Sequence, residues 1–290
     1  MNAKSPNRQL FSLLRESVNS CVVNPVILFP FATIAFIQLL VIEIIYFSPR
    51  FPLVRFFGPV IRRLEGEIYL HYPHNFMILP KWFQIAQYFI YIFIGSFLTA
   101  VATVIIANLN SSKKTNFSSA VRETLPQYVH IALAAIITFA AFYGLTEILG
   151  LIVRRAVQIQ SQTGIFYVIK AIVLYGLPYY NLLIGVLVTT VFAFVFPAIV
   201  IDRKKIVPAL LVNFRYLWKS FWFLFVVILI PTLFYVPVLL LRNNFGSSMD
   251  MTFQELKLAL MVLSVLVMLF IDAAIYTALA TYYLMKKEAQ

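Results

Sequence analysis

Residues Leu258–Leu284 read LALMVLSVLVMLFIDAAIYTALATYYL, an apolar run in which Asp272 is the only charged residue. A helix needs about 20 apolar residues to cross the hydrocarbon core of a bilayer, so this run is long enough to span a membrane. A second run of this kind covers Phe221–Leu241. Backbone groups in hydrocarbon must satisfy their own hydrogen bonds, which favours helices, and the alternating pattern of barrel strands is missing. The two runs predict a helical membrane protein.

The composition of the 290-residue chain supports this interpretation. Hydrophobic residues make up 62% of it and charged residues only 12%, whereas a soluble domain carries about 25% charged residues. The formal net charge is +12, but the 23 Lys and Arg residues are spread over all the loops, as is usual beside anionic headgroups. The charge therefore does not predict nucleic-acid binding. The single cysteine, Cys21, excludes an internal disulfide and a multi-cysteine metal site.

Six spanning segments are predicted, separated by polar stretches that contain Pro, Gly or Asn. They form one polytopic domain over residues 1–290. Gly176 and Pro178 interrupt the apolar stretch around the fourth segment, so we expect an interfacial helix to end near Leu177 and the crossing to start afterwards. The segments are Val22–Phe47, Trp82–Leu109, Tyr128–Val153, Asn181–Ile201, Phe221–Leu241 and Leu258–Leu284.

The distribution of Lys and Arg over the loops predicts the orientation. If the N-terminus is cytoplasmic, the segments on that side carry 13 of these residues and the segments on the opposite side carry 10. Cytoplasmic loops of membrane proteins carry an excess of positive residues. We therefore expect both termini in the cytoplasm.

The segment Pro208–Trp222 reads PALLVNFRYLWKSFW and directly precedes the fifth apolar run. On a helical wheel its large apolar side chains gather on one side, while Asn213, Arg215 and Lys219 lie on the other. This pattern predicts an amphipathic helix in the membrane plane with a basic, wet face. Basic residues just upstream can meet the same anionic headgroups. The candidate headgroup contacts in this region are Arg203, Lys204, Lys205, Arg215 and Lys219.

Related segments precede the first and third spans. Leu14–Ser17 reads LRES and Val121–Thr124 reads VRET, at an offset of 107 residues, and Leu210–Phe214 follows in register 89 residues later, with Asn213 in place of the hydroxyl residue. We expect three repeats of an amphipathic interfacial helix plus a helical hairpin, over residues 8–110, 111–201 and 202–286. The three interfacial helices would then lie on one side of the membrane. The alternative is a chance match, because many polytopic proteins carry an interfacial segment before a span.

The stretch from Phe196 to Trp222 carries a resemblance to a known family. FPAIVID at 196–202, Ala209-Leu210, Asn213-Phe214 and SFW at 220–222 resemble a pattern in bacterial six-span proteins. That superfamily includes the membrane domain of glycerophosphodiester phosphodiesterases and the YciC-like envelope proteins. The sequence departs from the pattern at Asn213, where Ser is usual, and at Ser220, where Asn is common. The resemblance implies a helical domain of the bacterial inner membrane; the phosphodiesterase chemistry belongs to a separate barrel domain and is not carried over.

Three carboxylates fall within or near the predicted spans: Glu43, Glu147 and Asp272. A charge at the bilayer centre costs about 2.5–3.5 kcal/mol on insertion scales, so each is a candidate functional group. Glu43 and Glu147 lie toward the ends of their spans and can reach the interface. Asp272 is the deepest, and we expect it either to contact a neighbouring helix or to act in a proton or cation relay. The structural role is favoured because no second intramembrane cation offers a partner.

The remaining sequence contains no catalytic motif. Gly58–Glu65 is predicted to form a short amphipathic helix with Pro59 in its first turn. Its Arg62 and Arg63 are candidates for headgroup contacts, or form a solvated face. His71 and His74 lack the further ligands that a closed metal site needs. No catalytic residue, metal or cofactor is predicted.

Two functions from different classes fit these observations. The sequence favours a noncatalytic protein of the bacterial inner membrane, a scaffold or envelope-maintenance factor that contacts lipids and either a membrane-protein partner or a second copy of itself. The alternative is a small transporter or lipid-handling permease with Asp272 and Glu147 lining its path. A polar cavity that reaches the middle of the bilayer would favour the transporter.

Overall fold

The computed structural model describes residues 6–158, 164–248 and 254–288, and every regular element within these ranges is a helix. Six helical segments are long and apolar enough to cross a membrane. The prediction of an all-α, multi-pass membrane protein is therefore confirmed. The six segments are Pro25–Phe47, Asn75–Asn110, Phe117–Val157, Gly164–Val200, Ile206–Leu233 and Glu255–Glu288.

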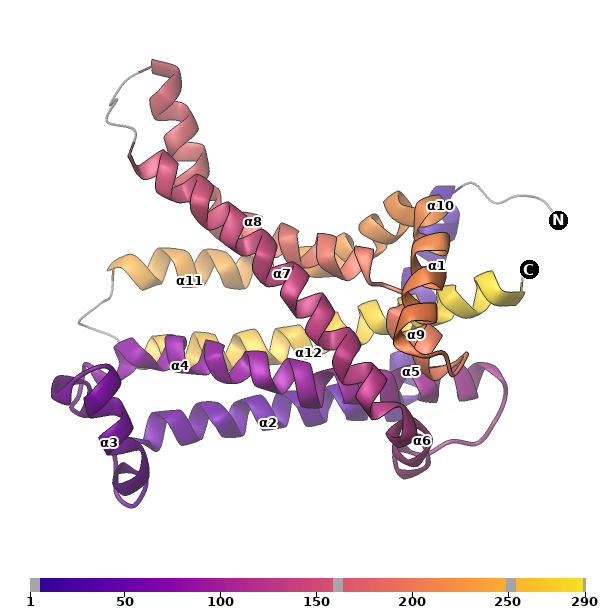
Figure 1. Ribbon diagram of the computed structural model, residues 1–290, viewed down its shortest axis with the longest axis horizontal. Coiled ribbons are helices and arrows are strands. Elements are labelled where there is room, and N and C mark those ends of the chain that lie inside the picture. The colour runs from indigo at the N-terminus through magenta and orange to yellow at the C-terminus, as the bar shows by residue number, and fades with distance from the viewer. Residues whose placement is uncertain (1–5, 159–163, 249–253, 289–290) are drawn as a thin grey trace.

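Most of the long helices run along the long axis of the molecule (Figure 1). α2, α4, α11 and α12 lie roughly parallel, whereas the hairpin of α7 and α8 crosses them and diverges from them toward the end of α7. The main helices are α1 (Pro6–Val23), α2 (Leu28–Phe47), α3 (Val54–Leu64), α4 (Asn75–Phe89), α5 (Ser96–Asn110), α6 (Phe117–Thr124), α7 (Tyr128–Val157), α8 (Gly164–Val191), α9 (Val195–Val200), α10 (Ile206–Leu233), α11 (Val236–Ser248) and α12 (Gln254–Glu288).

The main core lies around α5. Ala100, Val101 and Ala102 on this helix have no exposed surface, because their small side chains allow neighbouring helices to approach closely. They pack in one cluster with residues of α2, α9, α10 and α12, including Phe31 and Leu224. A π-helical segment, η3 (Ile90–Gly95), connects α4 to α5, so that α4, η3 and α5 form one continuous crossing.

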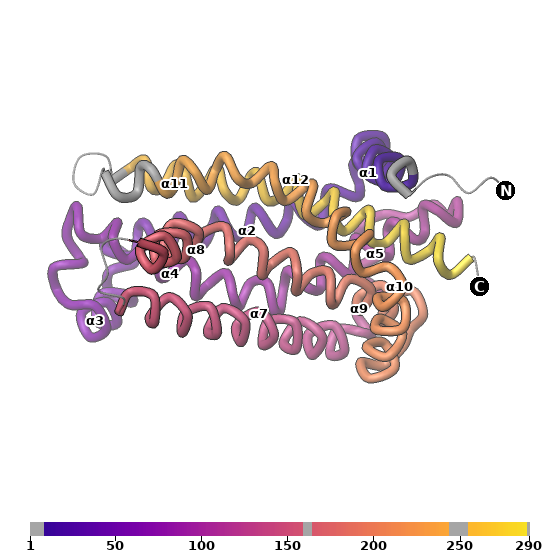
Figure 2. The backbone as a smooth tube through the Cα atoms, turned by 90° about the horizontal axis from the view of Figure 1, so that it is seen from above, coloured from indigo at the N-terminus to yellow at the C-terminus, as the bar shows by residue number. Residues whose placement is uncertain are grey.

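Three segments run across the long axis at the same end of the molecule. α1, α6 and the N-terminal part of α10 all lie there, and the C-terminal part of α10 turns to run along the bundle toward α11 (Figures 1 and 2). α1 packs against α12, and α6 packs against α5. A capping box between Asn116 and Ser119 starts α6. These are the three segments for which the sequence predicted amphipathic interfacial helices.

The predicted break at Pro178 is wrong, because α8 runs without interruption from Gly164 to Val191. Membrane helices tolerate proline where neighbouring groups satisfy the freed backbone. The ring of Tyr180 lies back along the helix, and its hydroxyl donates to the carbonyl oxygen of Ile172 at 3.3 Å. Gly176 provides the space, since a Cβ there would lie 2.6 Å from the Tyr180 ring. The fourth crossing therefore starts well before Asn181.

The predicted interfacial helix Pro208–Trp222 and the fifth span are not separated by a break, and the change of direction between them is a bend within one helix (Figure 1). α10 is one helix from Ile206 to Leu233. The chain instead breaks at Phe234 and Tyr235 and continues as α11, so the stretch 242–248, predicted as a loop, is helical. The break lies between Pro231 and Pro237, where two missing backbone donors disfavour a continuous helix.

Asn213 does not lie on a wet face of α10. It is fully buried, its Oδ1 accepts from the backbone N–H of Phe194 at 2.9 Å, and its Nδ2 donates to the carbonyl oxygen of Val191 at 2.7 Å. Asn213 therefore fixes the junction between α8 and α9. The outward side of α10 carries Trp218 and Trp222, which are 91% and 74% exposed.

The predicted helix Gly58–Glu65 begins earlier than expected. α3 starts at Val54, so Pro59 lies inside the helix and not in its first turn. The helix ends before Gly66, whose φ of 111° favours glycine.

Candidate functional site

A cavity of about 690 Å³ lies among α4, α8, α10, α11 and α12. It extends along α12 from Met261 to Tyr276, which corresponds to about 22 Å at the rise of an α-helix. Hydrocarbon side chains such as Leu182 and Ile228 form part of its wall, together with polar side chains from several helices. The polar lining includes Gln84, Gln87, Asn181, Thr189, Thr232 and Ser264.

Asp272 lines the inner part of this cavity. Its neighbours Ile271 and Ala273 are buried, but Asp272 is only partly buried because it faces the open space. Within the ranges that the structure describes, its carboxylate forms no hydrogen bond and no ion pair. A carboxylate surrounded by apolar helices without a partner is costly. Asp272 is therefore placed to interact with a group that enters the cavity.

Three tyrosines surround the same region of the cavity. The Asp272 carboxylate lies within electrostatic range of the hydroxyls of Tyr91 and Tyr276, and Tyr235 lies within range of Tyr91. The Tyr276 ring stacks on Phe31, with centroids 6.2 Å apart. Together with Asp272 they form what we call the carboxylate–tyrosine cluster: Asp272, Tyr91, Tyr235 and Tyr276.

Local backbone structure places Tyr91 in this cluster. Tyr91 belongs to the π-helical segment η3, whose turns are wider than those of the α-helices on either side. Such π-helical turns occur frequently at functional sites, because they redirect side chains within a helix. Tyr91 also lines a second, small void of about 10 Å³, together with Asp272 and the buried Gln38 of α2.

The other two predicted carboxylates lie outside the cavity. Glu147 is exposed on α7, where it faces Arg154 at 3.8 Å. Glu43 is exposed near the end of α2. The structure therefore brings neither of them to Asp272. Instead, Arg242 of α11, a cation that the sequence analysis did not single out, lines the same cavity as Asp272.

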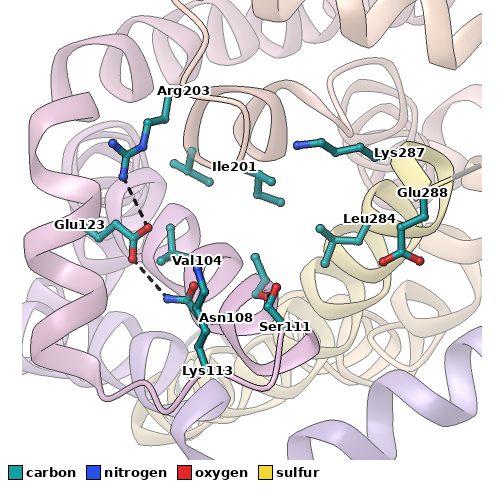
Figure 3. A pocket seen from close by; sticks show the side chains of 12 residues that line it. Val104, Asn108, Ser111, Lys113, Glu123, Ile201, Arg203, Leu284, Lys287 and Glu288 are labelled. Atoms are coloured by element: carbon teal, nitrogen blue, oxygen red, sulfur yellow. Dashed lines mark hydrogen bonds and ion pairs between the residues drawn. The ribbon is translucent and has the colours of Figure 1, made fainter. Parts of the chain in front are cut away.

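A second pocket, of about 540 Å³, lies at the end of the molecule where α6, α9 and the C-terminus of α12 meet (Figure 3). Arg203 faces Glu123 at 3.8 Å, and Glu123 also accepts from Asn108 at 3.2 Å. The backbone of Arg203 is left-handed, with φ of 52°, which turns the chain sharply between α9 and α10. Lys287 extends from the last turn of α12 toward the pocket. The C-terminal ends of several helices lie at this pocket, and the helix dipoles favour cations there.

Asp202 connects the loop between α9 and α10 to the last turns of α12. Its carboxylate accepts from the Tyr283 hydroxyl and from the Lys287 ammonium, both at 2.7 Å, and faces Lys204 at 3.5 Å. Burial opposes the charged form, but the hydrogen bonds from Lys287 and Tyr283 outweigh it and hold the pKa of Asp202 below its ordinary value. Arg203 and Lys204, predicted as headgroup contacts, therefore have partners within the protein.

The other predicted headgroup residues lie on exposed surface. Arg215 and Lys219 are exposed on α10 beside its lipid-facing tryptophans, and Lys205 is exposed before the first turn of α10. Arg62 pairs with Glu67 at 2.8 Å, and Arg63 is exposed on the same helix, α3. The five residues thus come from both ends of the molecule (Figure 1).

Comparison with known proteins gives no assignment. No family model, no curated protein and no solved structure matches this chain. Within the described residues no group of three or more His, Cys, Asp or Glu side chains could hold a metal ion. The features that bear on function are therefore the cavity beside Asp272 and the pocket beside Arg203.

Proposed function

We propose that this chain is a small transporter or lipid-handling permease, and that the cavity around Asp272 is its binding site. The observation that carries this proposal is the cavity itself, which reaches an unpaired carboxylate halfway along α12. Its volume falls within the range of about 300–1,000 Å³ found for small-molecule sites. A polar cavity and an unpaired charge weaken a helix bundle, so a protein that only forms a scaffold has no use for them.

The divergence of the α7–α8 hairpin supports an entry route from the side. α8 contributes Leu177, Leu182 and Val186 to the cavity wall, and it is also the helix that separates from the other crossings in Figure 1. We therefore place the entrance of the cavity between α8 and the neighbouring crossings. An amphiphile entering there keeps its apolar part in hydrocarbon while its polar group reaches the polar lining.

A thiol-labelling experiment tests the proposal. In a Cys21→Ser background, Ser264→Cys places a thiol in the cavity, and Leu266→Cys places one on the outer face of the same helix, where Leu266 is exposed. We expect a water-soluble maleimide to label position 264 at least tenfold faster than position 266. Equal and negligible labelling of both positions would show a dry cavity and would exclude the proposed function.

The scaffold function favoured by the sequence remains a second candidate, supported by the surface of α10. Trp218 and Trp222 project from the lipid-facing side, and Arg215 and Lys219 are exposed beside them. Aromatic and basic residues together are typical of helices that bind the membrane interface. In this function the partners are membrane lipids, and a membrane-protein partner or a second copy of the chain would bind the same end.

We further propose that the chain contains three related units, in line with the resemblance to bacterial six-span proteins. Equivalent positions in the three interfacial segments support this idea, because each has a buried polar residue followed by an exposed apolar residue. The Ser17 and Thr124 hydroxyls both donate to the carbonyl oxygen four residues earlier. The pairs are Ser17-Val18, Thr124-Leu125 and Asn213-Phe214.

The proposed location is the inner membrane of a bacterium, with both termini in the cytoplasm. In the Cys21→Ser background, Lys114→Cys and Lys205→Cys are expected to react from the cytoplasmic side only, and Arg63→Cys from the opposite side only. All three positions are exposed. Reaction of positions 114 and 205 from opposite sides would exclude the arrangement of three units.

A further inference from the structure

We propose that the cavity binds an organic ammonium group, with its positive charge against the Asp272 carboxylate and the rings of Tyr91, Tyr235 and Tyr276. This inference rests on the proposed function, and it names the class of ligand.

An ionised Asp272 in this cavity favours a cation as its partner. Asp272 has no hydrogen-bond or ion-pair partner within the described residues. The cation that lines the same cavity, Arg242, forms no ion pair with it within 4.0 Å. Arg242 lies seven residues beyond Tyr235, about 10 Å further along α11. A ligand cation is therefore the partner that compensates Asp272.

The chemistry of the lining favours an organic ammonium over a metal ion. Calcium takes six to eight oxygen ligands and magnesium demands a near-octahedral set, but the cluster offers a single carboxylate among phenol rings. An alkylammonium ion needs one counter-charge, and the faces of aromatic rings attract it by about 0.5–2 kcal/mol each. Asp272 supplies the counter-charge, and the rings come from Tyr91 and Tyr276 near it and from Tyr235 beside Tyr91.

The rest of the cavity accommodates the remainder of an amphiphile. Its wall also contains hydrocarbon side chains from α8 and α12, including Leu177 and Met268. These side chains can pack against an alkyl chain, while Arg242 and Gln84 provide polar contacts for a second polar group. An amine-bearing amphiphile and the ethanolamine headgroup of a lipid share this chemistry.

Binding of benzyltrimethylammonium to the purified full-length protein in a nonionic detergent tests the ligand class. We expect saturable binding by isothermal titration calorimetry, weakened at least tenfold in Asp272→Asn and in Tyr276→Leu. Tyr276→Phe keeps the ring and is expected to bind like the unmodified protein. The matched control is Glu43→Gln, which removes an exposed carboxylate outside the cavity and should leave binding unchanged.

The outcomes separate this inference from the proposed function. If Ser264→Cys is labelled but benzyltrimethylammonium does not bind, or binds equally to Asp272→Asn, the ligand class is wrong while the cavity function stands. If Asp272→Asn fails to fold, equal binding by Tyr276→Leu and Tyr276→Phe overturns the inference on its own. Unlabelled position 264 would overturn the proposed function itself.

Native mass spectrometry then distinguishes the two sources of the ammonium group. Retention of phosphatidylethanolamine by the unmodified protein, and its loss in Asp272→Asn, would identify a lipid headgroup. Benzyltrimethylammonium binding without retained phosphatidylethanolamine would identify a diffusible amine. Preferential retention of phosphatidylglycerol that depends on Asp272 would contradict the inference, since that headgroup carries no cation.

Discussion

Asn213→Leu is expected to destabilise the protein by about 2–6 kcal/mol, because it leaves two buried backbone groups without partners. The side chain of Asn213 is fully buried. It holds the N–H of Phe194 at 2.9 Å and the carbonyl of Val191 at 2.7 Å. Each buried group that loses its hydrogen bond costs about 1–3 kcal/mol. Leucine has the same side-chain branching as asparagine with bulkier ends, so the change removes the hydrogen bonds without opening a void.

The measurement is the thermal unfolding temperature of the purified protein in detergent, together with its abundance in membranes. The matched control is Phe214→Leu on the adjacent residue, which is 47% exposed and faces away from the core. We expect the control to unfold close to the unmodified protein and Asn213→Leu to unfold well below it. Equal unfolding temperatures for the two variants would mean that Asn213 does not hold the α8–α9 junction.

The position of Asn213 illustrates what a helical wheel cannot decide. The wheel separates the apolar side chains of 208–222 from Asn213, Arg215 and Lys219. It assigns the polar side to water, but a polar residue in a membrane protein can also turn inward and bond to other helices. Lipid accepts the apolar side chains, so Trp218 faces outward and Asn213 faces the protein. The periodicity was sufficient to predict a helix but not the surroundings of its two faces.

The number of crossings, by contrast, follows from the lengths of the apolar runs. Six apolar runs predict six helices because hydrocarbon leaves the backbone no other way to satisfy its hydrogen bonds. The boundaries of the helices depend on proline, which has different effects at two places in this chain. Pro178 is accommodated within α8, whereas the chain breaks at 234–235 between Pro231 and Pro237. Two prolines six residues apart were the available signal for that break.

The candidate site could be predicted only in part. Asp272 is evident from the sequence as the one charge in an apolar run. The cavity beside it is not, because it forms where α8 diverges from α4 and α12, helices that are distant in the sequence. Tyr91 and Tyr276 carried a weak signal as polar-tipped residues in the middle of apolar runs. The ion pair between Arg203 and Glu123 depends on a tertiary contact and had no signal in the local sequence, whereas Asp202, the partner of Lys204, lies only two residues away.

Asp202→Ala is expected to destabilise the protein by about 2–3 kcal/mol at neutral pH, because Asp202 joins the loop before α10 to the end of α12. The change removes the acceptor of the Tyr283 hydroxyl, whose residue is only 1% exposed, and of the Lys287 ammonium, both at 2.7 Å. Hydrogen bonds to charged groups contribute about 1.5–3 kcal/mol each, and Lys287 recovers part of its share in water.

The pH dependence gives the sharper test of this second prediction. The pKa of Asp202 in the folded protein lies below its ordinary value of 3.8, so the carboxylate stabilises the fold above that value and this contribution is lost as the pH falls through the lower, folded-state pKa. We therefore expect the unfolding temperatures of the unmodified protein and Asp202→Ala to differ by a constant amount from neutral pH to about pH 5 and to converge in stronger acid.

The matched control is Glu288→Gln, which removes an exposed carboxylate from the same end of α12 and should change stability by less than about 0.5 kcal/mol. A difference between Asp202→Ala and the unmodified protein that persists unchanged in acid would mean that the charge of Asp202 does not hold α12 to the α9–α10 loop.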